Sequence, residues 1–180
     1  ANITNQIVTE SIRVQSGVFD DAGYSISGNG NSQGIGVSKN FEVYNNAKFV
    51  LKGSSSFPTG FSNIILSANS TVQYEGNGPQ TIRSLNYGNL INSNTGNRTL
   101  DNSNAIGIAG SFTPGSNSYI ITGSTVNYNG VSTQTISAFN YFNLTSSNTG
   151  NRTILSSGKV RIANVFSPGN NVYTITNSTI

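Results

Sequence analysis

The sequence contains no cysteine, no histidine, no methionine and no tryptophan. Without cysteine the chain can form neither a disulfide framework nor a zinc site with thiolate ligands. Without histidine it lacks the side chain on which most metal sites and most Ser–His or Cys–His nucleophile pairs depend. These absences exclude many enzyme classes, and we expect no catalytic residue, no bound metal and no cofactor.

Charged side chains are also scarce, at 8% of the chain, with nine Lys or Arg against six Asp or Glu. These numbers are too small for a basic nucleic-acid groove or for an array of calcium-binding carboxylate loops. No apolar run approaches the roughly 20 residues that a membrane-spanning helix needs. We therefore expect neither a nucleic-acid partner nor a membrane span.

Small polar residues dominate what is present. The chain has 28 Asn, 27 Ser, 18 Thr and 20 Gly, which together make 93 of its 180 residues. Disordered chains combine low hydrophobicity with high charge. Here the charge is low and 34% of residues are hydrophobic, so the composition favours a folded chain, and the length suits one domain.

A long internal repeat organises the sequence. Residues 70–123 align without a gap to residues 124–177, and 29 of the 54 positions are identical. A match at this level is not a product of composition, and it defines two consecutive repeats. The motifs that return in the second copy are Ser70–Tyr74 as Ser124–Tyr128, Asn94–Thr99 as Asn148–Thr153, and Phe112–Gly115 as Phe166–Gly169.

The remaining residues form partial or divergent copies. Residues 53–69 resemble the end of the first repeat with three extra residues, and residues 1–52 match least. Terminal repeats are expected to diverge because they cap the stack. Residues 178–180 begin a further repeat. We interpret the chain as one continuous domain with divergent N-terminal coils.

Each repeat divides into three shorter units that carry a central threonine. In the second copy these are Gln134-Thr135-Ile136, Arg152-Thr153-Ile154 and Tyr173-Thr174-Ile175. The numbers of the three threonines differ by 18 and then by 21. Three units fill one repeat, so a unit averages about 18 residues.

The periodicity within these units is that of β-strands. Short runs rich in Val, Ile, Thr, Tyr and Phe alternate with period two, as at Val126 and Tyr128, between Asn, Gly and Ser residues typical of turns. A repeat of about 54 residues is half an immunoglobulin-like sandwich, and about three repeats are too few for a propeller. The sequence therefore predicts an all-β fold, a parallel β-solenoid or β-helix of about ten coils of roughly 18 residues, with strands stacked about 4.8 Å apart.

Several of these motifs resemble the repeats of very large secreted bacterial surface proteins, of which Bacteroidetes-type adhesins are the best known. The motifs are Phe57–Phe61, Ser70–Gly76, Gln80–Ile82 and Tyr87–Leu90, and they match a pattern S-T-V-x-Y-N-G…Q-T-I…Y-x-N-L-T. The resemblance covers most of residues 16–177. It implies an extracellular, adhesin-like β-solenoid and no enzymatic activity. The chain departs from that family by being short and by lacking a recognisable C-terminal sorting domain.

Candidate binding residues are few. Tyr87 and Tyr141, with Arg98 and Arg152, occupy equivalent positions in the two repeats and could form a row that contacts surface glycans. The alternative is a solvated arginine in a turn beside a partly buried tyrosine.

Two other features favour structural roles. The pair Asp20-Asp21 favours a turn, because neighbouring strand residues point to opposite faces. The glycine-rich stretch 28–36 lacks the spacing of a nucleotide-binding loop and favours a flexible loop.

The ends of the predicted solenoid indicate a further property. The last coil of a solenoid exposes unpaired backbone groups, and a second chain can use these groups as a template. Either the sequence is part of a longer array, or the first coil of another copy completes this end. In the second case we expect Ile3, Ile7 and Val8 of one copy to pair near Ser178, Thr179 and Ile180 of another. Contacts of this head-to-tail kind that do not close into a ring give open filaments.

We therefore predict an extracellular or cell-surface structural protein, after removal of a signal peptide. It would be a filament subunit or adhesin stalk whose partners are copies of itself and, in a second role, surface glycans. The alternatives are a carbohydrate-binding surface module and a β-helical polysaccharide lyase or hydrolase. The lyase needs a cluster of Asp, Lys and Arg on one face, and the sequence offers no obvious one.

Overall fold

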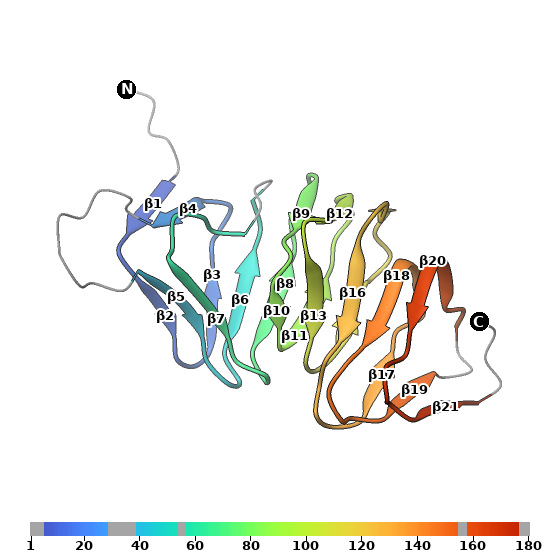
Figure 1. Ribbon diagram of the computed structural model, residues 1–180. Helices are drawn as coiled ribbons and strands as arrows, with labels where there is room; N and C mark the ends of the chain where they lie inside the picture. The colour runs from blue at the N-terminus through green and yellow to red at the C-terminus, as the bar shows by residue number, and fades with distance from the viewer. Residues whose placement is uncertain (1–5, 29–38, 54–56, 155–157, 177–180) are drawn as a thin grey trace.

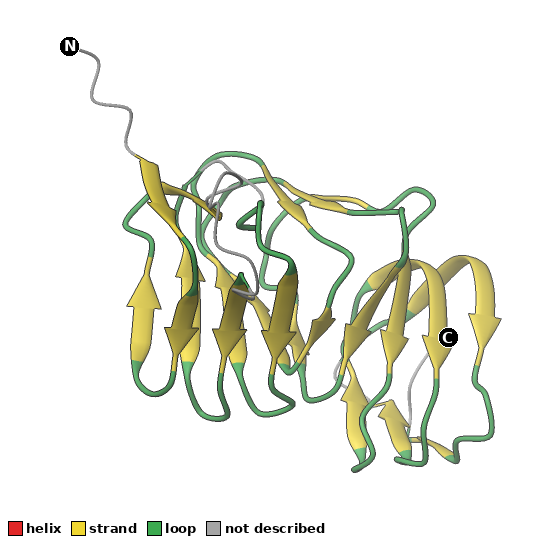
Figure 2. Ribbon diagram, turned by 60° about the vertical axis from the view of Figure 1, so that its left-hand side comes forward, coloured by secondary structure: helices red, strands yellow, loops and turns green. Residues whose placement is uncertain are grey.

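Stacked parallel strands make up the protein (Figures 1 and 2). A computed structural model describes residues 6–28, 39–53, 57–154 and 158–176, and these residues contain strands, turns and no helix. Every strand pair among them is parallel, as in β1 with β4 or β19 with β21. The predicted all-β parallel solenoid is confirmed.

The described strands are two to seven residues long. In chain order they are β1 Gln6–Thr9, β2 Ile12–Val14, β3 Val18–Asp20, β4 Ser25–Gly28, β5 Asn40–Val43, β6 Lys48–Leu51, β7 Asn63–Leu66, β8 Thr71–Tyr74, β9 Gln80–Ile82, β10 Asn86–Tyr87, β11 Asn89–Asn92, β12 Arg98–Leu100, β13 Ala105–Ile108, β14 Phe112–Thr113, β15 Tyr119–Ile120, β16 Thr125–Tyr128, β17 Gln134–Ile136, β18 Asn140–Ser146, β19 Arg152–Ile154, β20 Arg161–Ser167 and β21 Tyr173–Ile175.

Two five-stranded sheets run along the molecule. One has the order β14-β11-β8-β6-β3, and the other has the order β10-β13-β16-β18-β20. Three-stranded sheets, among them β15-β12-β9 and β17-β19-β21, form further faces of the coil. Within each sheet the strands of successive turns lie side by side, so their side chains lie in columns.

The spacing between stacked strands is less regular than the sequence predicts. Four strand pairs keep the expected offset, for example Thr71 with Asn89. Other pairs are more widely spaced along the chain, such as Asn86 with Gly107 and Val18 with Lys48. The coils are therefore longer on average than the sequence predicts. The count of ten coils is not confirmed.

A thin core runs along the inside of the coil. Strands such as β8 and β11 alternate between buried and partly exposed residues, as expected for strands with one face inside. Near the N-terminal end the core is a cluster of phenylalanines with ring centroids 4.9–5.7 Å apart. Farther along, tyrosine, leucine, isoleucine and valine replace them.

The two five-stranded sheets are offset, and the chain passes between them several times. β10 and β11 are separated only by Gly88, yet they belong to different sheets. In the second repeat the equivalent residues form one strand, β18, whose pairing with β20 shifts register between Tyr141 and Asn143. Figure 2 shows the consequence, a C-terminal group of strands displaced from the N-terminal group.

Candidate functional site

The four residues predicted to contact glycans lie inside the coil. Tyr87, Arg98, Tyr141 and Arg152 each have an exposed fraction of 0%. Both sequence-based interpretations placed the arginines at the surface, and both are wrong on this point. A glycan on the outside of the coil cannot reach these side chains, so a glycan row at these positions is not supported.

Backbone carbonyls surround the guanidinium group of Arg98. Its Nη2 donates to the carbonyl oxygens of Ser93 (2.8 Å), Gly76 (3.0 Å) and Tyr74 (3.3 Å). Its Nη1 donates to the carbonyl of Asn97 at 3.3 Å. Burial lowers the pKa of Arg98, but arginine stays protonated in proteins. The carbonyl dipoles therefore stabilise a buried positive charge and hold two successive turns together.

The second repeat forms the same set of contacts, in which one buried arginine donates to several backbone carbonyls. We call this set of contacts the arginine clamp. Nη2 of Arg152 donates to the carbonyls of Ser147 (2.7 Å), Tyr128 (2.8 Å) and Gly130 (3.3 Å). These three acceptors are the second-repeat equivalents of the three residues that accept from Nη2 of Arg98. The arginine at this position is thus a structural requirement of the repeat.

Amide side chains occupy the neighbouring turns at the same corner. Gln80 donates to the carbonyls of Leu51 and Gly53, and Asn117 donates to those of Asn94 and Gly96. The register places Gln80 beside Arg98 in adjacent strands. Gln134 and Asn171 repeat these contacts in the second copy. We call this column of Gln, Arg and Asn side chains the corner ladder.

Two tyrosine pairs lie across the interior. The hydroxyls of Tyr74 and Tyr87 are 3.0 Å apart, and Tyr87 donates to the carbonyl of Arg83. The hydroxyls of Tyr128 and Tyr141 are 2.9 Å apart in the equivalent place. Burial raises the pKa of Tyr74 to about 12 and raises that of Tyr87 well above its usual value. These hydroxyls remain protonated at neutral pH and serve as structural hydrogen-bonding groups.

Asp20 ends β3 and Asp21 follows it, and both side chains cap the turn at Ala22 and Gly23, in agreement with the predicted turn role. Asp20 accepts from the backbone N–H of Ala22 and pairs with Lys52, whereas Asp21 is buried and accepts from the N–H groups of Gly23 and Lys52. A hydrogen bond from Lys52 lowers the pKa of Asp20, and burial raises that of Asp21. Their different partners agree with side chains on opposite faces.

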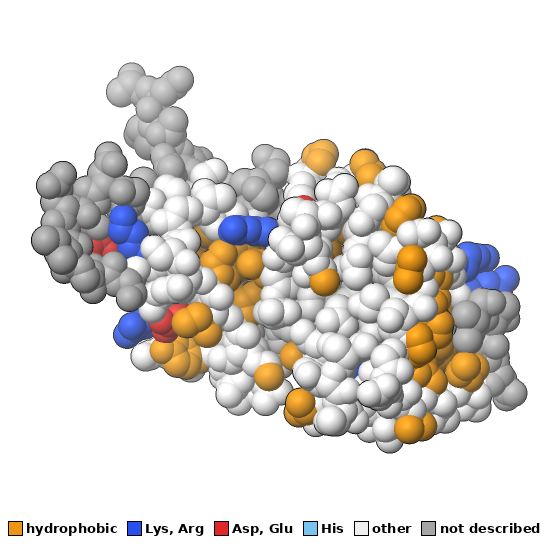
Figure 3. All heavy atoms as spheres, in the orientation of Figure 1, with side chains coloured by type: hydrophobic (Ala, Val, Ile, Leu, Met, Phe, Trp, Pro, Cys, Tyr) orange, Lys and Arg blue, Asp and Glu red, His pale blue; other side chains and the backbone are white. Residues whose placement is uncertain are grey.

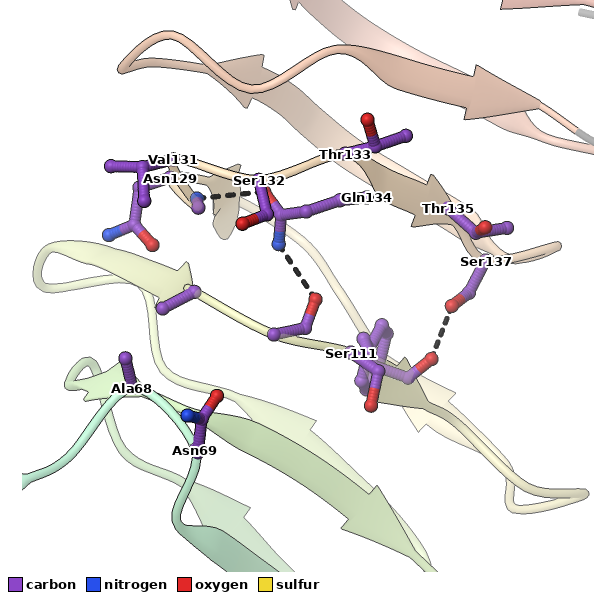
Figure 4. Close-up of a pocket in the computed structure, with 14 residues that line it drawn as sticks. Ala68, Asn69, Ser111, Asn129, Val131, Ser132, Thr133, Gln134, Thr135 and Ser137 are labelled. Atoms are coloured by element: carbon purple, nitrogen blue, oxygen red, sulfur yellow. Dashed lines mark hydrogen bonds between the residues drawn. The ribbon is translucent and has the colours of Figure 1, made fainter. Parts of the chain in front are cut away.

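A hollow beside the second repeat has no ionisable lining residue. It measures about 830 Å³ and lies between residues 68–69, 109–112 and 129–137 (Figure 4). Gln134 points inward to the carbonyl of Gly110, and Ser137 contacts the carbonyl of Phe112. Within the described ranges, no group of three or more carboxylates could hold a metal ion. The hollow therefore offers hydroxyl and amide groups but no acid or base for catalysis.

The C-terminal end of the coil exposes apolar side chains. Phe166 on β20 is 41% exposed, although its equivalent in the first repeat, Phe112, is 4% exposed. Phe139 of the following turn packs against Phe112 at 5.3 Å between ring centroids. Val165 and Val172 are also exposed beside Phe166. Phe166 therefore occupies a position that the following turn covers in the first repeat, whereas Val165 and Val172 correspond to Ser111 and Ser118, which are exposed there as well.

The N-terminal end has a matching apolar groove. It measures about 510 Å³, and its lining includes Ile12, Val14, Val18 and Phe19 from β2 and β3. Val18 is 65% exposed. Both strands lie at the edge of their sheets, so their outer backbone groups face away from the stack.

The predicted assembly residues lie only partly within the described chain. Ile7 and Val8 form part of β1, where they pair with Ile26 and Ser27 of β4. Ile3, Ser178, Thr179 and Ile180 lie outside the described residues, as does most of the glycine-rich stretch 28–36. The predicted assembly residues did not include Phe166 or Phe19. The equivalence of Phe166 with Phe112 could have indicated Phe166 from the sequence.

Comparison with known proteins gives no relative. No protein-family model matches the chain, and no curated protein or solved structure matches it significantly. In the part of the chain that the structure describes, no helix is long and apolar enough to cross a membrane.

Proposed function

We propose that this protein is an extracellular structural subunit of a bacterial surface, a filament subunit or adhesin stalk that assembles end to end. The observation that carries the proposal is the exposure of Phe166 at a position that is buried in the preceding repeat. A second copy would cover it with its N-terminal coil, as a further coil covers Phe112. The extracellular and bacterial assignments rest on the resemblance of the repeat motifs to those of secreted surface proteins.

The register within the sheets suggests how two copies would meet. Phe19 pairs with Phe49 at the start of one five-stranded sheet, and Phe166 pairs with Leu144 at the end of the other. If β3 of one copy adds in parallel to β20 of the next, Phe19 continues the buried column beside Phe166. Val18 then lies next to Val165. This arrangement buries apolar surface at both ends and pairs two exposed strand edges.

The interior chemistry supports a structural role. Arg98 and Arg152 are the largest buried polar side chains. Their hydrogen-bond acceptors are backbone carbonyls of the same chain. Head-to-tail contacts, which join one end of a molecule to the opposite end of the next copy, generate open filaments when they do not close into a ring. The solenoid would thereby extend from one molecule into the next with the same backbone ladder.

Substitution at the C-terminal end tests the proposal. Phe166→Asp places a charge where the second copy would pack and should abolish assembly, because a buried unpaired charge is strongly unfavourable. Val131→Asp is the matched control, since Val131 is 74% exposed on a turn. Electron microscopy and sedimentation velocity should show filaments for the natural protein and for Val131→Asp, and monomers for Phe166→Asp. Monomers of the natural protein at its highest soluble concentration would contradict the proposal.

A further inference from the structure

The charge of the protein is unevenly distributed along the chain. Residues 1–101 contain six acidic and six basic residues, whereas residues 102–180 contain no Asp or Glu and three basic residues. The formal net charge of +3 therefore belongs to the C-terminal part. Of its three cations, Arg152 is buried, and Lys159 and Arg161 are exposed.

Lys159 and Arg161 lie together on one groove. Val160 between them is buried, so the two flanking side chains of this extended segment point outward on the same side. The groove measures about 640 Å³, and residues 114–121 form its opposite wall. In Figure 3, blue side chains lie at the C-terminal end of the molecule with no red beside them.

The rest of the lining combines amides, hydroxyls and ring edges. Asn140 accepts a hydrogen bond from Nη1 of Arg161 at 3.4 Å and so orients that cation. Ser118 lines the facing wall beside Asn117, whose Nδ2 already donates to the backbone carbonyls of the corner ladder. Tyr119 and Phe139 are partly buried, meet at 4.8 Å between ring centroids, and contribute an aromatic wall.

The first repeat has a similar groove without the cations. It measures about 490 Å³ and lies between β7 and the start of β10. Four of its lining residues are the first-repeat equivalents of lining residues of the second groove: Ser84 of Ala138, Leu85 of Phe139, Asn86 of Asn140, and Ala105 of Lys159. Gly107 stands at the position of Arg161. The repeat therefore folds without these two cations, which leaves them free for a role other than stability.

We propose that the groove of Lys159 and Arg161 binds a carboxylate-bearing saccharide. The two cations suit one or two carboxylates, and the amide and hydroxyl groups suit sugar hydroxyls. The groove volume lies within the roughly 300–1,000 Å³ range of small-ligand sites. A nucleic acid is disfavoured because a strand typically engages about six to ten phosphates, whereas this groove offers two cations. The proposal does not rest on end-to-end assembly or on the buried tyrosines and arginines, although Arg161 is the first residue of β20, the strand used in the proposed assembly.

Titration calorimetry with trigalacturonate, and with neutral galactotriose as its uncharged counterpart, tests the assignment. We expect trigalacturonate to bind at low salt, galactotriose to bind at least about tenfold more weakly, and molar salt to abolish binding. The double variant Lys159→Ala with Arg161→Gln should lose at least about tenfold in affinity. Far-UV circular dichroism should confirm that it folds.

Two controls separate the saccharide site from general anion binding. Lys48→Ala removes a cation from the N-terminal part and should leave affinity unchanged. Sodium sulfate and a thymidine oligonucleotide serve as competing anions and should displace trigalacturonate poorly. Equal affinity of the double variant, equal binding of galactotriose, or tighter binding of sulfate or the oligonucleotide would each overturn the proposal.

Discussion

At the scale of single residues, arginine at positions 98 and 152 shows best how the sequence and the fold are related. A basic residue between Asn and Thr in a turn-rich stretch is usually exposed, and nothing in its neighbours along the chain indicates otherwise. The carbonyls that stabilise it come from the preceding turn, 22 and 24 residues earlier for Gly76 and Tyr74. The recurrence of the arginine could be read from the sequence, but its burial depends on stacking that only the folded coil provides.

The clamp makes a specific prediction for Arg98→Lys. Lysine has three donors on one nitrogen and cannot span the carbonyls that the planar guanidinium reaches. Leaving buried carbonyls without donors should reduce the free energy of unfolding by roughly 3 kcal/mol, measured by denaturant unfolding. Arg83→Lys is the control, because Arg83 is partly exposed and makes one long contact, to Pro58. A loss no larger than that of the control would contradict the role of the clamp.

Asp101 predicts a dependence of stability on pH. Burial disfavours its ionised form, but hydrogen bonds from Ser103 and Ser84 outweigh burial and lower its pKa to about 2. Because this pKa is lower in the folded than in the unfolded chain, the stabilisation is complete above about pH 4 and is lost as the pH falls toward 2.

Comparison with Asp101→Asn measures that contribution. At pH 7 the variant should be less stable by about 1 kcal/mol, the value of a typical hydrogen bond at a partly exposed site. Denaturant unfolding between pH 7 and pH 2 should show the difference shrinking below pH 4. A difference that stays constant over this range would mean that the carboxylate is not stabilised by the fold.

At the scale of strands, the sequence predicted the elements well and their distribution among sheets poorly. The two repeats are identical at 29 of 54 positions, yet β10 and β11 separate into two sheets where β18 continues as one strand. One of the three positions that differ in this segment is Gly88, which is Phe142 in the second copy and stands where β10 and β11 separate. A Cβ at Gly88 would lie 2.6 Å from the carbonyl oxygen of Ser70 and closer still to that of Ser67. A tightly packed corner of this kind needs glycine. The period-two pattern of apolar residues, which predicts strands, does not predict where such a corner lies.

Gly88→Ala therefore predicts a loss of stability. The added methyl group meets backbone atoms that cannot move independently, and we expect a cost of about 2–3 kcal/mol in the free energy of unfolding. Gly17→Ala is the control, since Gly17 has φ of +70° and open space around it. It should cost about 1 kcal/mol through backbone strain alone. Equal costs for the two variants would show that close packing at the corner contributes nothing.

At the scale of the whole molecule, the two ends expose apolar side chains, and the packing of the interior gives no reason for this exposure. The columns of the core and the corner ladder continue from one turn to the next, and they lead to Phe166 and Val165 at one end and to Val18 and Phe19 at the other. The sequence indicated an open end through its repeat but placed the contact on terminal residues. The assembly proposed above instead uses strands β20 and β3, where Phe166 and Val18 are exposed.

The central claim is that β20 of one copy adds to β3 of the next, and the absence of cysteine allows a direct measurement. Val18→Cys with Val165→Cys places two thiols on neighbouring strands of two molecules, at a separation of about 4.8 Å that suits a disulfide. Under mild oxidation we expect a ladder of covalent oligomers on a non-reducing gel. The pair Val18→Cys with Val131→Cys, which replaces the end contact by an exposed turn, should give no such ladder. Covalent species equally abundant for both pairs, or monomers alone for the first, would contradict end-to-end assembly.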